Sequence, residues 1–360
     1  MTFARSESQT LIENTASLLL AKANASEARR QRLSAVTPDR LALWPQLAEQ
    51  GVLGAAFTEQ AGGFGGTMRD LAVVMTQVGR RLVVEPVLYG AVCGRVLHAA
   101  GDTERLATFI SGECVLSLAH CEGADPFAPL ATQAVSAAGK YRLSGRKLAV
   151  RHADCAQAFV VSADLSGQPA WFLVDANDAG VNAETYRLLD ASGGATLSFR
   201  DASARLLQSG AAAIDEALVW LLVGLAAETT GIVEALNETT FAYLGTRKQF
   251  GVPLASFQAL QHRAAEMYAA AEQLRSLCNR AIDAIDDESP TRIALASAVK
   301  AFAADMGRRV GHEGVQMHGG MGVSDELDVS HYMRRLATIR AEFGSAEVHR
   351  TRFTALAGGY

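Results

Sequence analysis

Eight small or apolar residues between positions 257 and 281 recur at alternating intervals of three and four. Such spacing places them on one face of an α-helix, as in the seam of a coiled coil. The pattern predicts a long helix, starting near Ser256, that packs lengthwise against other helices in an antiparallel bundle. The seam residues are Phe257, Leu260, Ala264, Met267, Ala271, Leu274, Cys278 and Ala281.

The segment before this helix combines a cation with two chain breakers. We expect Arg247 to end one helix and Gly251 and Pro253 to interrupt the chain before the next begins. A guanidinium beside the backbone amides of a helix start suits an anion such as a pyrophosphate. The same spacing fits a plain helix–turn–helix corner with a solvated arginine, and these residues alone leave both interpretations open.

A second segment ends in glycines, because Gly319, Gly320 and Gly322 follow Gln316 and His318. Glycines at a helix end allow the chain to reverse and allow a ligand to approach the backbone closely. The sequence has neither a G-x-G-x-x-G after a strand nor a P-loop. A dinucleotide would therefore have to be held outside a Rossmann frame.

Composition limits the functional classes. The 360 residues, 49% of them hydrophobic, are enough for two or three domains. A formal net charge of -5 argues against nucleic acid or an anionic membrane as a general partner. The five cysteines show no regular spacing, so neither a disulfide framework nor a metal site is indicated. The apolar run at 18–20 is too short for a membrane span or a secretory signal, and we expect a cytoplasmic protein.

The secondary-structure signals divide the chain into three parts. Residues 1–112 are predicted to be mostly helical, and residues 209–360 are predicted to be helical again, with helices beginning at Ser289-Pro290 and after Ser345. The predicted fold class is α+β, with an N-terminal helical domain, a middle β-barrel domain and a C-terminal antiparallel helical bundle. The middle part, residues 113–208, holds short β-leaning runs at 114–118, 141–143, 159–161, 171–174 and 196–199.

Together these motifs resemble those of the acyl-CoA dehydrogenases, a flavoprotein family that uses FAD. Two segments carry the resemblance: R-x-x-F-G-x-P-L-x-x-F-Q-x-x-Q-H, which starts at Arg247, and E-G-x-Q-x-H-G-G-x-G, which starts at Glu313. The segments 61–66 and 78–86 are also similar to family motifs, so the likeness covers nearly the whole chain. It implies an acyl-CoA substrate, an electron-transfer flavoprotein as electron acceptor, and a dimer or tetramer of like or unlike subunits.

The resemblance also implies where FAD would bind. In the family, FAD lies in a cleft between the β domain and the bundle, and a neighbouring subunit contributes to its adenosine and pyrophosphate. For Phe257, which also lies on the helix seam, a core role is an equal alternative. The cofactor-binding residues implied by motif position are Arg247, Phe250, Phe257, Gln258, Gln316, Gly319, Gly320, Ser345 and Glu347.

The catalytic base is the point at which the chain departs from the family. The family commonly places a glutamate in a Y-E-G-T-S-E-like segment before the last helix, and an ungapped alignment puts Phe343 there, with Glu342 one residue earlier. Phenylalanine cannot accept a proton, and neighbouring side chains diverge in helices and strands. Glu342 is therefore the candidate catalytic residue only with an unusual local backbone. An alternative base position in the family falls close to Leu221, which is apolar.

Three functions stay open. The first is an autonomous FAD-dependent acyl-CoA dehydrogenase that introduces an α,β double bond. The second is a flavin-binding, base-deficient subunit of a heteromeric dehydrogenase, similar to the small subunits of pimeloyl-CoA or steroid-side-chain dehydrogenases. The third is a relative with other flavin chemistry. His120 stands in a strand end where the family has a hydroxyl donor to the flavin, and it is a candidate replacement for that donor.

Overall fold

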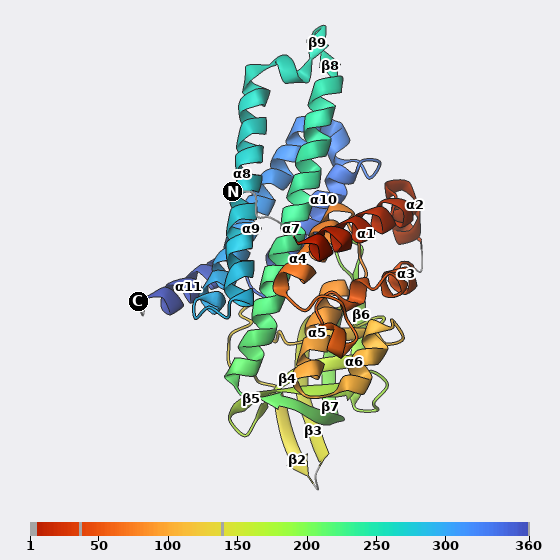
Figure 1. Ribbon diagram of the computed structural model, residues 1–360, viewed down its shortest axis with the longest axis vertical. Coiled ribbons are helices and arrows are strands. Elements are labelled where there is room, and N and C mark those ends of the chain that lie inside the picture. The colour runs from red at the N-terminus through yellow and green to blue at the C-terminus, as the bar shows by residue number, and fades with distance from the viewer. Residues whose placement is uncertain (1–5, 36–37, 138–139, 359–360) are drawn as a thin grey trace. The chain divides into compact units, whose positions relative to one another are not determined.

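The computed structural model describes residues 6–35, 38–137 and 140–358 (Figure 1). Helices come first, strands follow and helices return, so the predicted α+β fold class is confirmed. Residues 1–5 and 359–360, which the predicted domains include, lie outside the described part. The chain divides into two compact units: one holds the residues up to Val74 together with Val84–Leu221, and the other holds Met75–Val83 together with the chain from Leu222 onward.

The first unit contains most of the N-terminal helices. Helix α1 begins at a capping box, in which Ser6 and Gln9 exchange hydrogen bonds between side chain and backbone. Helix α6 begins at Asp102, whose side chain accepts a hydrogen bond from the Arg105 amide. The elements are α1 (Glu7–Ala23), α2 (Ser26–Ser34), α3 (Trp44–Glu49), η1 (Val52–Gly54), η2 (Glu59–Ala61), α4 (Met68–Arg80), α5 (Val87–Ala99) and α6 (Thr103–Ile110).

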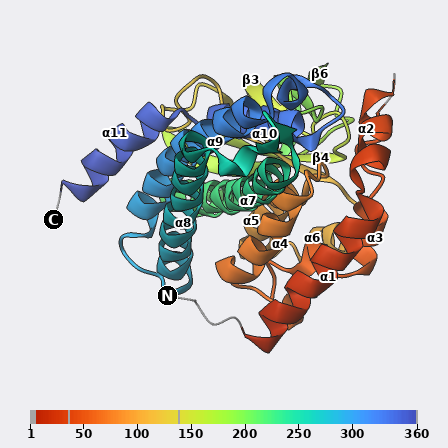
Figure 2. The same ribbon diagram turned by 90° about the horizontal axis from the view of Figure 1, so that it is seen from above.

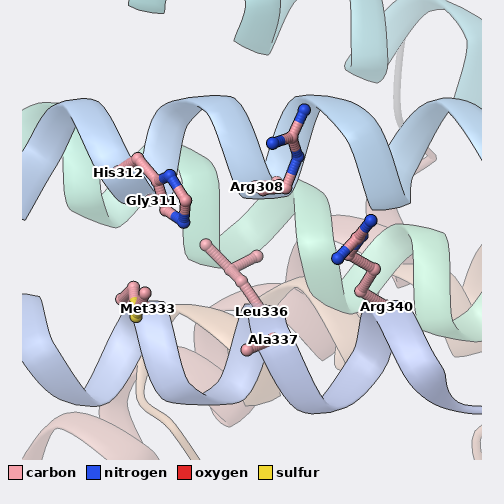
Figure 3. Close-up of a pocket in the computed structure, with 8 residues that line it drawn as sticks. Arg308, Gly311, His312, Met333, Leu336, Ala337 and Arg340 are labelled. Carbon is pink, nitrogen blue, oxygen red and sulfur yellow. The ribbon is translucent and has the colours of Figure 1, made fainter.

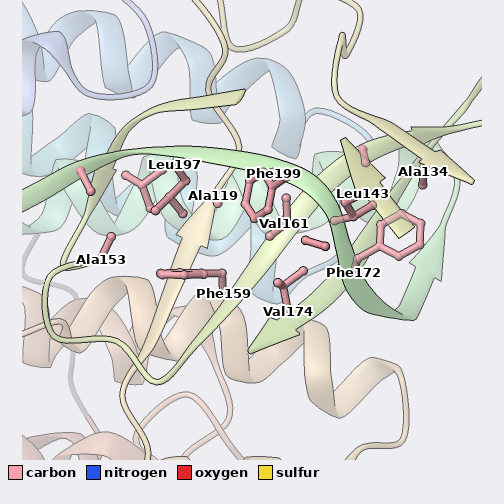
Figure 4. Close-up of a cluster of buried hydrophobic side chains, with 14 of the residues drawn as sticks. Ala119, Ala134, Leu143, Ala153, Phe159, Val161, Phe172, Val174, Leu197 and Phe199 are labelled. Atoms are coloured by element: carbon pink, nitrogen blue, oxygen red, sulfur yellow. The ribbon is translucent and has the colours of Figure 1, made fainter. Parts of the chain in front are cut away.

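The strands of the same unit close into a barrel. Strand β4 pairs with β5, β5 with β7, β7 with β3, β3 with β2, and β2 returns to β4. Phe159, Val161, Phe172, Leu197 and Phe199 belong to the buried cluster that fills its interior (Figure 4). The strands are β1 (Leu116–Ala119), β2 (Gln133–Ala137), β3 (Lys140–Arg151), β4 (Ala158–Leu165), β5 (Gln168–Asp175), β6 (Val181–Arg187) and β7 (Gly193–Ser209).

All five predicted β runs overlap strands, although β1 begins at Leu116, two residues later than predicted, and β2 and β6 were not predicted. Strand β6 is exposed along nearly its whole length and is held by backbone pairing to β7. It therefore lacks the alternating hydrophobic signal on which sequence reasoning depends. The predicted boundaries at 112 and 208 lie close to changes of secondary structure. They are not the boundaries of the compact units, because α5 packs against β1 and β7 and belongs to the same unit as these strands.

The second unit is built around α7 (Ala211–Thr246), a helix that runs on from the first unit. Among the described residues, α7 is the one helix long and apolar enough to cross a membrane. Of its apolar 18-residue stretch, 94% is buried inside the protein. A helix that is apolar on all sides is expected at the centre of a bundle. The hairpin β8 (Lys248–Gln249) and β9 (Val252–Pro253) follows at one end of α7 (Figure 1).

Helix α9 joins the remaining helices, because it packs against α8, α10 and α11 (Figure 2). Helix α8 confirms the helix predicted from the seam: five of the eight seam residues are buried, and the three nearest the hairpin are half-buried. Its neighbours confirm the predicted bundle. The elements after the hairpin are η3 (Leu254–Ser256), α8 (Gln258–Asp286), α9 (Arg292–His318), η4 (Gly319–Val323), α10 (Asp328–Ala341) and α11 (Ala346–Ala357).

The predicted start of α9 at Ser289-Pro290 is wrong by two residues. The helix begins at Arg292 after Thr291, and no side chain caps it. The Ser289 hydroxyl oxygen instead accepts a hydrogen bond from the Thr291 amide at 3.3 Å. A serine that bonds to the backbone two residues later forms a local turn, which competes with capping and delays the helix.

Glycines allow α4 and α7 to cross at close range within the second unit. A Cβ added at Gly231 of α7 would lie 2.0 Å from the Thr76 carbonyl oxygen of α4. A methyl group there must push two helix backbones apart. The crossing therefore depends on the absence of a side chain at this position.

We predict that Gly231→Ala lowers the free energy of unfolding by about 3 kcal/mol. The matched control is Gly245→Ala on the exposed end of the same helix, where an added Cβ would meet nothing within 4 Å. This change should stabilise the protein by about 0.5–1 kcal/mol, because alanine favours the helix. Thermal or urea unfolding of the two variants measures the difference, and equal effects would contradict the close crossing.

Candidate functional site

The segment that joins α7 to α8 forms a tight, exposed hairpin. Its turn residues Phe250 and Gly251 both have positive φ angles, 51° and 84°, which is the geometry of two-residue hairpin turns. The Leu254 amide donates to the Arg247 carbonyl at 2.8 Å and closes the hairpin behind that arginine. Phe250 is 93% exposed, and its ring meets Phe257 edge-on at 6.2 Å. An aromatic residue held out in this way offers a ring to a ligand or to another chain.

The glycine segment ends α9 in a conformation that requires glycine. Gly319 has φ 61° and ψ -141°, a region of backbone space that L-residues rarely adopt. An added Cβ at Gly319 or Gly320 would meet nothing within 4 Å, so the surface above these residues is open. The preceding His318 is buried, its Nδ1 donates to the Gly314 carbonyl at 2.8 Å, and burial lowers its pKa. The histidine is therefore neutral at pH 7.

The two motifs lie at the same end of the second unit. The Tyr243 ring stacks on the His318 ring with a centroid distance of 4.3 Å. Tyr243 precedes Arg247 by one helical turn, and His318 precedes Gly319 directly. The arginine segment and the glycine segment therefore lie near each other within one chain, and the stacked pair that joins them was not singled out from the sequence.

The polar groups at this end are available to a ligand. Arg247, Gln258 and Gln316 are exposed, and the structure gives none of their side chains a hydrogen bond or ion pair within its described residues. Guanidinium and amide groups beside an open glycine backbone fit the phosphates and polar edges of a dinucleotide. The arrangement thus fits FAD, and Phe257, which is half-buried, is compatible with both of its predicted roles.

Ser345 and Glu347 lie elsewhere in the unit. Ser345 is the N-cap of α11 and accepts a hydrogen bond from the Val348 amide, while Glu347 is exposed in the first turn. The turn before Ser345 is bonded to Lys300 of α9 through the Gly344 carbonyl. Lys300 and Gln316 are 316 − 300 = 16 residues apart on α9, which is about 24 Å at the helical rise. The nine predicted cofactor residues therefore form two groups at separate places on one chain.

The predicted base, Glu342, is held in a buried ion-pair cluster. Arg335 Nη1 donates to Glu342 at 2.7 Å, and Arg335 Nε and Nη2 donate to both carboxylate oxygens of Glu228 at 2.6 Å and 2.8 Å. The Glu342 and Arg335 side chains are each 9% exposed, and that of Glu228 is 3% exposed. This cluster could not be predicted, because Glu228 and Arg335 are 107 positions apart and each alone resembles a solvated helix residue.

Phe343, which occupies the expected base position, has a positive φ of 51° and is buried at 8% exposure. The backbone around Glu342 is thus unusual, as the displaced-base hypothesis required. The glutamate nevertheless points into an ion pair. The alternative base position, Leu221, is fully buried in α7.

His120 is engaged inside the barrel domain. Its Nε2 donates to the Pro126 carbonyl at 2.7 Å, and its Nδ1 lies 2.9 Å from the Ser162 hydroxyl. Lys147, which is fully buried, donates to that hydroxyl, to the His120 carbonyl and to Glu122. Both ring nitrogens are used inside the protein, so this arrangement does not support His120 as a donor to the flavin.

Glu122 holds the loop between β1 and β2. It accepts hydrogen bonds from the Ala131 and Thr132 amides and from Lys147 Nζ. Burial opposes ionisation of the carboxyl, but the hydrogen bonds from Lys147 and Thr132 outweigh it and lower the pKa of Glu122 to about 2. The ionised form is therefore favoured in the folded protein.

A lowered carboxyl pKa stabilises the fold above the ordinary pKa, and the stabilisation is lost as pH falls toward about 2. We predict that Glu122→Gln lowers the free energy of unfolding by on the order of 1–2 kcal/mol at pH 6, after allowance for solvent screening. The deficit should shrink steadily below about pH 4.5. Urea unfolding at a series of pH values measures this, with Glu184→Gln on the exposed strand β6 as control. A deficit that does not depend on pH would contradict the assignment.

A groove of about 250 Å³ lies between α9 and α10 (Figure 3). Arg308 and Arg340 lie at one end, His312 and Met333 lie at the other, and Leu336 forms part of the apolar floor. The groove is smaller than the usual range for bound ligands. None of the nine residues predicted to bind FAD lines it.

Comparison with known proteins identifies the family. The N-terminal domain model of the acyl-CoA dehydrogenases matches residues 6–112, and the C-terminal domain model matches residues 208–355. Acyl-CoA dehydrogenase FadE27 of Mycobacterium tuberculosis is 30% identical over 320 residues, which cover 84% of this chain and 83% of the relative.

Solved structures agree with this assignment. The Tcur3481-Tcur3483 steroid ACAD, G363A variant, superimposes with a TM-score of 0.92 at 28% identity over 98% of each chain. The ChsE4-ChsE5 complex from Mycobacterium tuberculosis gives a TM-score of 0.92 at 24% identity over the whole of both chains and supports the fold. The chain belongs to the acyl-CoA dehydrogenase family of FAD-binding oxidoreductases.

Proposed function

We propose that this chain is the flavin-binding, base-deficient subunit of a heteromeric acyl-CoA dehydrogenase. The proposal rests on the aligned base position, where the sequence has Phe343, and on the neighbouring Glu342, which is paired with Arg335 at 2.7 Å. A general base must be within reach of the substrate proton and able to take it up. A carboxylate held by a buried guanidinium meets neither need.

The ion-pair cluster explains why Glu342 is a poor substitute. Turning Glu342 toward a substrate would remove it from Arg335, which would leave only Glu228 to balance the buried guanidinium. The guanidinium would stay paired with Glu228, and the loss of one charge-assisted hydrogen bond costs about 1.5–3 kcal/mol. The cluster therefore favours a Glu342 that stays in place.

The separation of the two flavin groups supports a shared site. Arg247, Gln316 and Gly319 lie near one end of α9, whereas Ser345 and Glu347 follow the Gly344 carbonyl, which is bonded to Lys300 about 24 Å back along that helix. The family motifs imply that both groups contact flavin and that a neighbouring subunit shares the site, so we propose that the two groups act from two different chains. In the proposed assembly, the Arg247 group of this chain completes the FAD site of a partner that supplies the base.

Two relatives support a heteromeric assembly. The steroid ACAD structure is named for two gene products, Tcur3481 and Tcur3483, and its chain is 28% identical to this one. ChsE4-ChsE5 is described as a complex. By analogy we propose a partner chain of the same family, an acyl-CoA substrate and an electron-transfer flavoprotein as acceptor.

In this scheme each residue has a limited role. Bound FAD would supply the acceptor for the hydride that leaves the β-carbon of the thioester. Arg247 would neutralise phosphate charge, Gln258 and Gln316 would donate to polar edges, and the open backbone at Gly319 and Gly320 would allow close approach. The proton from the α-carbon would go to a carboxylate of the partner subunit.

We predict that Arg247→Gln weakens FAD binding by about ten- to a hundredfold, because one charge-assisted contact to phosphate is lost. Titration of the reconstituted protein, followed by flavin fluorescence, measures this. Arg280→Gln, an exposed arginine on α8, controls for the change in net charge. Unchanged FAD affinity in Arg247→Gln would place the flavin elsewhere.

We also predict that the FAD-loaded protein, purified without other subunits, is not reduced by any acyl-CoA. Anaerobic addition of short, medium and aromatic acyl-CoAs should leave the visible band of oxidised flavin unchanged, in the wild type and in Glu342→Gln alike. Bleaching that the wild type shows and Glu342→Gln lacks would instead establish an autonomous dehydrogenase with a displaced base. Dithionite reduction confirms in each sample that the flavin is reducible.

A further inference from the structure

The turn that carries positions 342–345 has a strained backbone. Phe343 has φ 51° and the following Gly344 has φ 100°. A bulky residue in the left-handed region costs on the order of 1–2 kcal/mol, and such a conformation persists only when its surroundings hold it. The contacts of this turn should therefore include groups that fix its carbonyls.

Lys300 of α9 provides one such group. Its Nζ donates to the Ile339 carbonyl at 3.1 Å and to the Gly344 carbonyl at 3.3 Å. The first lies in the last turn of α10, and the second lies two residues before α11. One ammonium thus bridges the chain on both sides of Glu342 and Phe343.

His349 of α11 provides another. Its Nε2 donates to the Phe343 carbonyl at 2.8 Å, and the side chain is fully buried. Two side chains from two helices therefore hold the carbonyls of residues 343 and 344 in the turn and that of residue 339 in the helix before it. The Ile339 carbonyl also accepts a hydrogen bond from the Glu342 amide at 3.2 Å, so Lys300 adds a second donor at the end of α10.

The cost of burying Lys300 is high. The side chain is fully buried, desolvation lowers its pKa to about 8, and the charge of Glu342 opposes that shift only in part. A methionine of similar shape would fill the space without this cost. The buried ammonium is best explained by its hydrogen bonds to the carbonyls on either side of the turn.

We propose that Lys300 is a positioning residue: with His349 it fixes the turn 342–345, so that side chain 343 and Ser345 face the flavin site in one defined geometry. The role in the flavin site rests on the proposed function. The fixing of the turn rests only on the contacts that Lys300 and His349 make within this chain.

Hydrogen–deuterium exchange of the whole protein without flavin tests the first part. In Lys300→Met, amides of residues 342–346 should exchange about tenfold faster, while those of α8 change by less than about twofold. The matched control is Ser297→Ala, a buried position one turn earlier on α9 whose hydroxyl has no hydrogen-bond partner among the described residues. It should leave the turn unchanged.

His349→Phe keeps the test decisive if Lys300→Met does not fold. It removes one carbonyl donor, and the turn should again exchange faster than α8. Unchanged exchange in the turn, or an equal rise throughout the second unit, would show that these residues only add general stability and would overturn the proposal.

FAD titration of the same variants tests the second part. Lys300→Met should weaken FAD binding by about tenfold, and Lys300→Arg, which keeps the donors and the charge, should recover part of the loss. Tight FAD binding by Lys300→Met would overturn the role in the flavin site. If the wild type took up no FAD, the proposed function would fail, whereas the exchange result would still decide the role of Lys300 in the turn.

Discussion

The second unit depends on a buried guanidinium. Arg335 of α10 uses its planar fork to bind both oxygens of Glu228 on α7 and a third nitrogen to bind Glu342. Arginine suits this position because its donors have fixed geometry and its charge cannot be lost. The cluster ties the central helix of the bundle to the end of α10. By holding Glu342 inward it also determines how the chain enters the turn that carries Phe343.

That turn connects the stability of the bundle with its chemistry. Arg335 binds the Glu342 side chain, while Lys300 and His349 hold the nearby backbone carbonyls. Phe343, the next residue, adopts a left-handed conformation. In the proposed subunit the framework of this turn is kept, although position 343 carries no base. A chain that needed no base could lose the glutamate and keep the turn, because Ser345 follows directly and belongs to the proposed flavin contacts.

Much of the fold could be predicted from the sequence. The 3–4 spacing of residues 257–281 gave α8, the glycines gave the end of α9, and Ser345 gave the start of α11, because each signal is local. Strand β6 could not be predicted, since backbone pairing holds it and its side chains are exposed. The start of α9 was predicted two residues too early, because Ser289 forms a local turn and does not cap the helix.

The candidate site was only half predictable for a similar reason. Arg247, Gln316 and Gly319 belong to short motifs with recognisable chemistry. The cluster of Glu228, Arg335 and Glu342, and the clamp formed by Lys300 and His349, join residues that are far apart in the sequence. These residues can be recognised as a cluster only from their burial and their contacts, and no single segment of the sequence shows either. The separation of the flavin groups along α9 likewise appears only when that helix is seen at its full length.

We propose that one chain carries two separate parts of a flavin site and needs a second chain to complete it. Native mass spectrometry of the FAD-reconstituted protein tests this most directly, because it resolves assembly and bound cofactor together. The account predicts FAD only on species of two or more chains, and a flavin-free monomer. A monomer that holds FAD as firmly as the larger species would contradict it.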